Sequence, residues 1–157
     1  MLLSSYTDHF SATLALWIST ASPTLVPEIA RAGGIIVHPE ADEITILVPE
    51  KFCIVTLENL EHSNAMSLLA ANINTYICYQ FKGFFMGSGP CTAAEDSLQL
   101  KYLDAFTDIL TRMGYDKENY FKAYHHQPSV ALTFKPLEVY EQTPKTGTGN
   151  RISLTAL

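Results

Sequence analysis

The sequence "YICYQFKGFFMG", residues 76–87, has the pattern of a β-strand, because aromatic and apolar residues dominate it and a Gly-Ser-Gly-Pro turn follows. Gln80 and Lys82 interrupt the apolar run. Successive side chains of a strand point to opposite faces, so these two residues, two positions apart, share one face. An amide and an ammonium on one face indicate either a solvent-exposed edge strand or a surface that meets a ligand.

Strand-like sequence continues on both sides of this stretch. The run 25–39 reads either as a pair of strands or as one long strand bent at the adjacent glycines Gly33 and Gly34. The last strand contains Lys135-Pro136, which predicts a break. Apolar and β-branched residues predict strands, in addition to 76–87, at 13–22, 25–39, 44–49, 65–73 and 129–142.

Four segments have helical character, and 92–114 is the clearest of them. Thr92 and Glu95 form a capping-box pattern at its start, and Gly114 stands where a helix commonly ends. Its apolar residues at helical spacing predict one buried stripe formed by Leu98, Tyr102, Ala105, Phe106, Ile109 and Met113. The other predicted helices are 4–12, 49–63 and 117–126.

The order of these elements favours a mainly β fold of the α+β class. Strand–turn–strand steps outnumber strand–helix–strand steps, which is typical of an antiparallel barrel with flanking helices and not of a doubly wound parallel sheet. A chain of 157 residues predicts a single domain, 1–157. Its end, 143–157, is rich in turn residues and is expected to form a C-terminal arm.

Composition narrows the classes of partner. The net charge is −6 and the ten basic residues form no run, which argues against a nucleic acid or an anionic membrane surface. The N-terminus lacks the pattern of a signal peptide, and the three cysteines have no metal-binding or disulfide spacing, so we expect a cytoplasmic protein with reduced thiols. Only 17% of residues are charged, which favours a surface partly covered by a partner subunit.

Motifs for nucleophilic, metal and phosphate-loop chemistry are absent. The sequence contains no G-x-S-x-G, and Cys53 lies on the apolar side of its predicted helix with Leu57 and Leu60. No histidines are spaced to share a metal, so we predict no metal site. The "GSGP" sequence at 87–90 lacks the Gly-Lys of a P-loop and is expected to form a tight turn.

Several short motifs, in order, resemble those of the pyridoxamine 5′-phosphate oxidase-like FMN-binding split-barrel family, and in particular its small uncharacterised bacterial branch. The resemblance implies a six-stranded antiparallel split β-barrel that forms a homodimer, with FMN held in two sites across the subunit interface. The motifs that carry it are "SPTLVPEIARAGG" (22–34), "ITILVPE" (44–50), "TLENL" (56–60), "QFKG" (80–83) and "VYEQTPKTGTG" (139–149).

The resemblance also implies which residues contact the cofactor. Arg31 stands where the family's strand arginine meets the phosphate, and Thr75, Gln80 and Lys82 lie on or beside the strand that contacts the flavin ring. Two family lysines are missing, one after the strand arginine and one in the following helix, which leaves Lys51 as the nearby candidate. Each lost charged hydrogen bond is worth about 1.5–3 kcal/mol, so the departure weakens the expectation of FMN.

Two functions remain open from the sequence. The first is an FMN-binding flavoprotein, with a possible oxidoreductase activity on an unknown small substrate, because in such proteins the flavin carries the chemistry. The alternative is a dimeric split-barrel binding or structural module whose flavin site has eroded and which catalyses nothing. In the second case Arg31 and Lys82 would form contacts between subunits or bind another anion.

Overall fold

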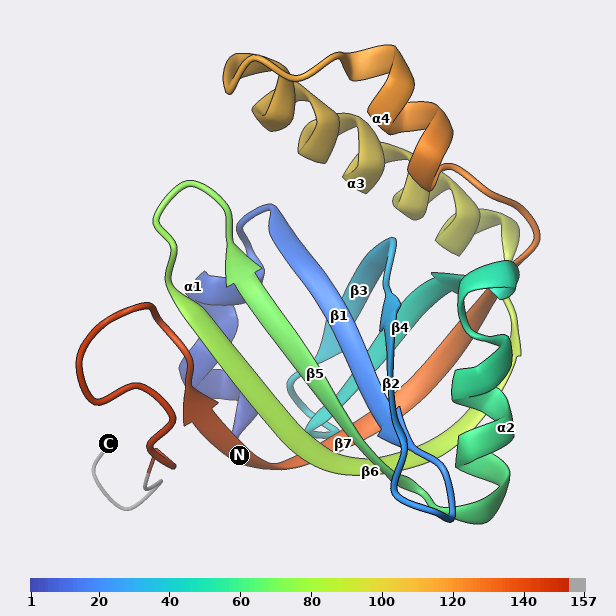
Figure 1. Cartoon of the computed structure of the whole chain (residues 1–157), viewed down its shortest axis with the longest axis vertical. Coiled ribbons are helices and arrows are strands. Elements are labelled where there is room, and N and C mark those ends of the chain that lie inside the picture. The colour runs from blue at the N-terminus through green and yellow to red at the C-terminus, as the bar shows by residue number, and fades with distance from the viewer. Residues whose placement is uncertain (153–157) are drawn as a thin grey trace.

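One curled antiparallel sheet organises the chain, which is described here from a computed structural model of residues 1–152 (Figure 1). Within those residues the sheet has seven strands in the order β2-β1-β5-β6-β7-β4-β3. The strands are β1 (Leu14–Ala21), β2 (Pro27–Arg31), β3 (Gly34–His38), β4 (Glu43–Pro49), β5 (Ala65–Asn72), β6 (Cys78–Pro90) and β7 (Ser129–Glu141). The helices are η1 (Leu3–Tyr6), α1 (Thr7–Phe10), η2 (Glu50–Phe52), α2 (Ile54–His62), α3 (Ala93–Arg112) and α4 (Lys117–Tyr124).

The predicted mainly β architecture with flanking helices is confirmed, but the sheet has seven strands and not six. The difference lies in 25–39, which bends sharply enough to form two strands with different partners. β2 pairs with β1, and β3 pairs with β4. At the bend, the Ala32 amide donates to the Leu16 carbonyl at 3.1 Å and the Gly33 amide donates to the Leu47 carbonyl at 2.7 Å. The chain therefore connects the two edge strands of the sheet, and this connection keeps the sheet curled.

β6 and β7 are the longest strands and form the centre of the sheet. β7 continues through Pro136, where the sequence predicted a break, because the register shifts there: Lys82 pairs with Glu138, and Gly83 pairs with Pro136. The intervening Leu137 bulges outward and is 46% exposed. The bulge leaves no room for a side chain at position 83. A β-carbon on Gly83 would collide with the Lys135 carbonyl oxygen.

The core lies inside the curl, and side chains mostly alternate between the two faces along the strands, although Ala15 and Leu47 are buried as well as their neighbours. Leu14, Leu16 and Ile18 of β1 are completely buried, whereas Trp17 between them points to the outer face. Other completely buried side chains come from β4, β5, β6 and β7: Ile44, Ile46, Leu68, Phe81, Leu132 and Phe134. Because every second residue faces inward, the outer face of the same strands is free to carry polar groups.

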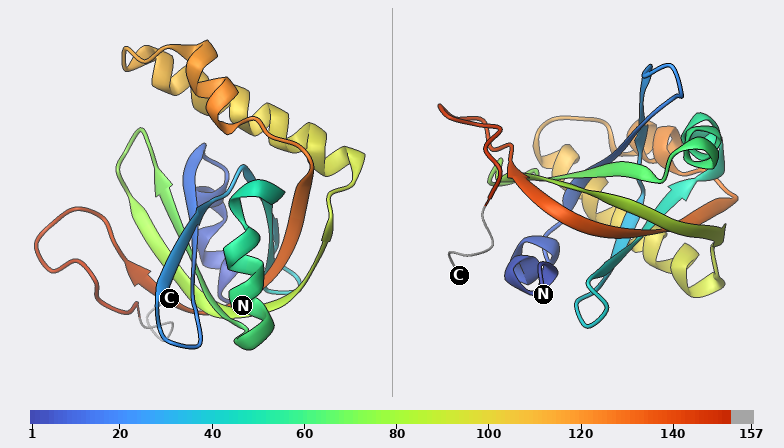
Figure 2. Two further views of the ribbon diagram at one scale, coloured as in Figure 1. Left: turned by 45° about the vertical axis from the view of Figure 1, so that its right-hand side comes forward. Right: turned by 90° about the horizontal axis from the view of Figure 1, so that it is seen from below.

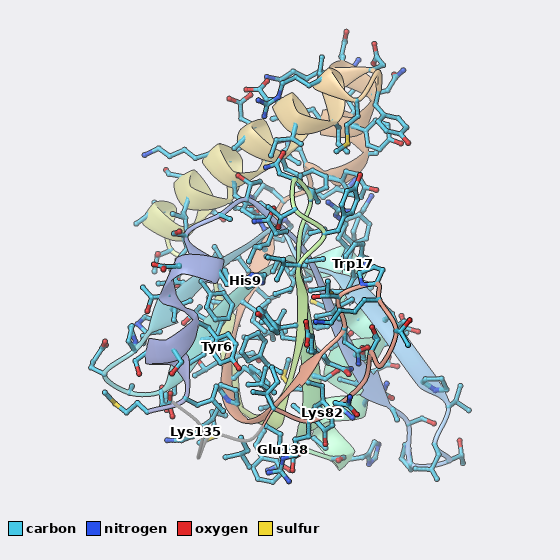
Figure 3. All side chains as sticks on the ribbon, turned by 90° about the vertical axis from the view of Figure 1, so that its left-hand side faces the viewer. Tyr6, His9, Trp17, Lys82, Lys135 and Glu138 are labelled. Atoms are coloured by element: carbon cyan, nitrogen blue, oxygen red, sulfur yellow. The ribbon has the colours of Figure 1, made fainter. Side chains whose placement is uncertain are left out.

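The N-terminal segment packs against the sheet beside Phe81. The backbone amides of Leu2 and Leu3 donate to the carboxylate of Asp42 at 3.0 and 2.8 Å, which anchors η1. The ring of Tyr6 meets Tyr79 and Phe81 edge to face, and His9 lies 4.9 Å from the Tyr79 ring centroid. Figure 3 shows Tyr6 and His9 directed from this segment toward the sheet.

α3 and α4 form a helical hairpin that lies across one end of the sheet, and α2 covers an adjacent side (Figure 2). The predicted capping box is confirmed, since Thr92 accepts from the Glu95 amide and Glu95 accepts from the Thr92 amide. Gly114 adopts φ +94° at the end of the helix, as glycine allows.

The predicted buried stripe of α3 is partly wrong. Leu98 and Met113 are 38% and 46% exposed, whereas Gln99 and Thr107 are buried together with Leu103. The buried face of α3 therefore contains polar residues. Gln99 is accommodated there because its side-chain oxygen accepts hydrogen bonds from Gln127, just before β7, and from Ser129, the first residue of β7. Periodicity alone favoured the more apolar face.

The chain after β7 turns and returns beside it. The Glu141 amide donates to the Asn150 carbonyl at 3.1 Å, and the Ile152 amide donates to the Val139 carbonyl at 2.8 Å. Arg151 also forms an ion pair with Glu138 at 3.0 Å. The predicted arm, 143–157, thus begins as a tight return, and its last five residues, 153–157, lie outside the described part of the chain.

Candidate functional site

A single row of residues crosses the outer face of five adjacent strands. Cross-strand pairing aligns Arg31 of β2 with Trp17 of β1, Trp17 with Leu69 of β5, Leu69 with Gln80 of β6, and Gln80 with Tyr140 of β7. Paired residues in adjacent strands have side chains on the same face. The structure therefore brings two predicted site residues, Arg31 and Gln80, onto one surface, about 14 Å apart across three strand spacings.

Aromatic rings surround the Arg31 guanidinium. Its central carbon lies 3.9 Å from the ring centroid of Tyr124, 4.3 Å from that of Phe106 and 5.7 Å from that of Trp17. Burial lowers the pKa of the Arg31 guanidinium, and the nearby hydroxyls of Tyr124 and Tyr102 oppose that change. Cation–π contacts of this kind stabilise a desolvated guanidinium by about 2 kcal/mol or more.

Within residues 1–152, no carboxylate lies within ion-pair distance of Arg31. A buried charge normally has an opposite charge beside it, because desolvation is costly. The aromatic rings compensate only in part, since their quadrupoles carry no net charge. Arg31 is therefore suited to bind an anion.

A groove of about 330 Å³ opens beside Arg31 and contains Lys51 as well. Lys51 lies in η2, is exposed, and places its ammonium 5.0 Å from the ring centroid of Phe52. Glu28 of β2 and Tyr124 of α4 also line the groove. The structure thus brings together the two residues predicted to hold a phosphate, and the volume lies at the lower end of the range for small-molecule sites.

Gln80 and Lys82 share the outer face of β6, as predicted, but both already have partners within the chain. The Gln80 amide nitrogen donates to the Ser67 hydroxyl at 3.2 Å, and its oxygen accepts from the Gln142 amide at 3.1 Å. The Lys82 ammonium lies 4.3 Å from the ring centroid of Tyr140. Figure 3 shows Lys82 near Glu138, its partner in the register.

Thr75 lies apart from these residues, in the turn between β5 and β6. The side-chain oxygen of Asn72 accepts from the Thr75 amide at 3.1 Å, and the Thr75 hydroxyl accepts from the Ile77 amide at 3.4 Å. Thr75 precedes Gln80 by five positions and lies outside β6, which begins at Cys78. Its visible role is to stabilise the hairpin.

Sequence reasoning missed the aromatic residues around Arg31. Tyr102 and Phe106 were assigned to a core stripe, whereas Phe106 in fact covers the guanidinium. Trp17 carried a usable signal, because it alternates with the buried Leu16 and Ile18 and must therefore face outward. The sequence around Tyr124 gave no signal of a contact with Arg31, because the packing of α4 over β2 depends on the tertiary structure.

The cysteines match the expectation of inert thiols. Cys53 is completely buried, and burial together with nearby Glu50 raises the pKa of its thiol to about 11. Burial, with the nearby Glu95 and Asp96, likewise raises the pKa of the Cys91 thiol to about 11. Thiols with such values are protonated near neutral pH and are poor nucleophiles.

Residues 1–152 contain no group of three or more histidine, cysteine, aspartate or glutamate residues placed to hold a metal ion. The same residues contain no helix long and apolar enough to cross a membrane.

A curled antiparallel half-barrel of this kind is already represented among solved structures. One similar structure is a Clostridium acetobutylicum protein described as related to general stress protein 26 of B. subtilis, in the pyridoxinephosphate oxidase family. It has 13% identity and a TM-score of 0.55, and the match covers 98% of this chain and 94% of the other.

Two further similar structures are described as flavin-binding. A pyridoxamine 5′-phosphate oxidase-related, FMN-binding protein from Nostoc punctiforme has 12% identity and a TM-score of 0.51, with 96% of this chain and 85% of the other covered. An FMN-binding protein from Syntrophomonas wolfei has 16% identity and a TM-score of 0.51, with coverages of 89% and 85%. No family model and no curated protein matches the sequence.

The resemblance predicted from the sequence is therefore confirmed at the level of the fold. At identities of 12–16% the shared feature is the backbone architecture. The function of this chain therefore depends on the side chains that its own sequence places on this backbone.

Proposed function

We propose that this protein is a cytoplasmic, homodimeric flavoprotein that binds FMN at its outer sheet face, with an oxidoreductase activity on a small substrate. Arg31 and Lys51 bind the phosphate, and the flavin ring extends along the face toward Gln80 and Lys82. The observation that carries the proposal is the Arg31 guanidinium, which is largely buried, has no carboxylate within ion-pair distance among residues 1–152, and borders the same groove as Lys51.

The charges in the groove suit a phosphate. A phosphomonoester carries about −1.5 to −2 charges at pH 7, and Arg31 and Lys51 together supply two positive charges. Lys51 takes the place of the two lysines that the family pattern has and this chain lacks. Glu28 opposes binding, so we expect an affinity below that of a site with three cations.

The flavin would supply the redox chemistry, and the chain's own residues would bind and position it. In this arrangement Arg31 fixes the phosphate end, and the rings of Trp17 and Tyr124 limit access of water to the guanidinium. Lys82 favours negative charge on a ring that lies beside it. Thr75 stays a prediction of the family resemblance and has no part in this arrangement.

Titration of the purified protein with FMN, followed by quenching of flavin fluorescence, tests the proposal. We expect saturable binding, with the dissociation constant raised about tenfold to hundredfold by Arg31→Gln or Lys51→Gln, since a charged hydrogen bond contributes about 1.5–3 kcal/mol. Arg112→Gln and Lys122→Gln, on exposed positions of α3 and α4, serve as matched controls and should leave binding unchanged. Absence of FMN binding by the wild-type protein would contradict the proposal.

A dimeric binding or structural module without flavin is the second candidate, and the state of Gln80 favours it. Both ends of that amide are engaged by Ser67 and Gln142, and Lys82 already lies over Tyr140. These contacts would have to break before Gln80 and Lys82 could contact a flavin ring. A colourless preparation that remains dimeric and does not respond to added FMN would select this candidate.

A further inference from the structure

A second, much smaller space lies on the other side of Arg31, beneath α3. Its volume is about 10 Å³, which is enough for one atom of the size of a water molecule. Arg31 and Gly33 border it from the bend between β2 and β3, and Gln99 and Tyr102 border it from α3. The space adjoins the open groove that contains Lys51, because Arg31, Phe52 and Tyr124 line both, but Gln99 and Tyr102 line only the smaller space of the two.

Two polar atoms at this cavity are buried and unpaired. Within residues 1–152, neither the Gln99 side-chain nitrogen nor the Tyr102 hydroxyl has a hydrogen-bond partner. The Gln99 carbonyl oxygen is fixed in the opposite direction, because it accepts from the Ser129 hydroxyl at 2.8 Å and from Gln127 at 3.3 Å. The nitrogen lies over Gly33, so close that a β-carbon there would be only 2.7 Å away.

Three groups at the cavity are suited to donate hydrogen bonds, and two further lining residues, Tyr124 and His125, can donate or accept them. Gln99 presents an NH₂ group, Arg31 presents N–H groups, and Tyr102 retains its hydroxyl proton because burial raises the pKa of that phenol. No aspartate or glutamate is among the described residues that line the cavity. An unpaired buried donor lowers the stability of the fold by about 1–3 kcal/mol. Two such donors beside the Arg31 guanidinium therefore favour the binding of a hydrogen-bond acceptor.

From this arrangement we propose that the cavity binds a single monatomic anion of the halide class. The ion accepts hydrogen bonds from Gln99 Nε2 and Tyr102 Oη and neutralises the charge of Arg31. A water molecule would satisfy the two donors but would leave the charge of Arg31 unbalanced. Phosphate is excluded by size. The inference concerns a different ligand from FMN, but Arg31 lines both spaces, so both ligands would draw on the charge of the same guanidinium.

Crystals of the wild-type protein grown or soaked in sodium bromide, without flavin, provide the direct test. We expect a bromide anomalous-difference peak in the cavity, within hydrogen-bond reach of Gln99 Nε2 and Tyr102 Oη. A cavity that shows ordinary water or no density, with no anomalous signal, would overturn the proposal. Because this measurement uses no variant, it does not depend on the stability of a mutant.

Thermal unfolding in solution provides the second test. At equal ionic strength, sodium bromide should raise the Tm of the wild-type protein above its value in sodium gluconate, whose anion is too large for the cavity. Tyr102→Phe should lose at least half of that increment, whereas Tyr115→Phe, at a position 50% exposed, should retain it. Equal Tm values of the wild-type protein in both salts, or a full increment in Tyr102→Phe, would contradict the proposal. Because neither test contains flavin, a negative result leaves the FMN titration unaffected.

Discussion

Gly83 is the residue at which the central strands approach most closely. A β-carbon there would overlap the Lys135 carbonyl and lie 2.8 Å from the Pro136 α-carbon. We expect Gly83→Ala to lower the free energy of unfolding by about 1–3 kcal/mol, the usual cost of overpacking, since backbone must shift to admit the methyl group. Chemical denaturation would measure it. Gly89→Ala, in the same strand with no atom within 4 Å, should change stability by less than about 0.5 kcal/mol.

His9 should make stability depend on pH. Burial lowers the pKa of its imidazole, and the hydrogen bond to the Ala70 carbonyl at 3.0 Å offsets that only in part. The folded protein therefore binds this proton less readily than the unfolded chain does. Stability contributed by neutral His9 is present above the unfolded pKa of about 6.5 and is lost as the pH falls toward the lower folded pKa.

The His9 prediction is checked by measuring unfolding between pH 4.5 and 7.5 for the wild type and for His9→Gln. The difference in stability between the two should shrink as the pH falls through this range. Carboxylates contribute equally to both proteins, so their effect cancels in the comparison. A constant difference across the range would show that His9 does not carry this dependence.

At the scale of the element, the capping box of α3 fixes where the helical hairpin begins. Thr92→Ala removes the side-chain acceptor for the Glu95 amide, 3.3 Å away, and should cost about 1 kcal/mol. The loss is measurable by thermal or chemical unfolding. Ser97→Ala is a suitable control: it removes a hydroxyl that only bonds back to Ala93 within the same helix, and it should be neutral or slightly stabilising.

For the same helix, local sequence patterns predicted the two ends but not the buried face. The cap and the C-terminal glycine depend on local backbone geometry, so both were predictable from a few adjacent residues. The buried face depends on what α3 packs against. Gln99 is buried because Ser129 and Gln127 meet its amide, and residues so distant in sequence cannot be paired by periodicity.

At the scale of the whole molecule, exposed apolar residues lie on the edge strand β2 and on elements next to it. They belong to β2, to the turn before it and to the start of α2: Leu25, Val26, Ile29, Ile54 and Val55. Exposed apolar patches next to an unpaired strand edge favour association with another copy. This surface is where we place the subunit contact of the proposed homodimer.

Light scattering coupled to size-exclusion chromatography tests this contact. The wild-type mass should be twice the chain mass of 17.4 kDa. Ile29→Lys, at a side chain 64% exposed, should shift the protein toward a monomer without changing the fold, and should weaken FMN binding if the site spans two subunits. Leu100→Lys, on an exposed position of α3, should remain dimeric. A monomeric wild-type protein would contradict the prediction.

The sequence by itself determined the elements and the class of fold. Strand alternation, turn residues and helix caps act over a few neighbouring residues, so the strands, the long helix and the antiparallel order were readable in advance. The shared face of Gln80 and Lys82 was also readable, because the two-residue period of a strand is local. The bend near Gly33 was predicted as well, and the pair of strands was one of the two readings of 25–39; the count of six strands came from the family resemblance.

Only the tertiary structure decided which side chains meet. The aromatic surroundings of Arg31 combine β1, β2, α3 and α4, and the groove adds Lys51 from η2. The unpaired donors of Gln99 and Tyr102 became visible in the same way, once α3 lay over the bend. The physical reason is that burial and charge compensation depend on contacts between distant segments, whereas hydrogen-bonded periodicity is set by each segment alone.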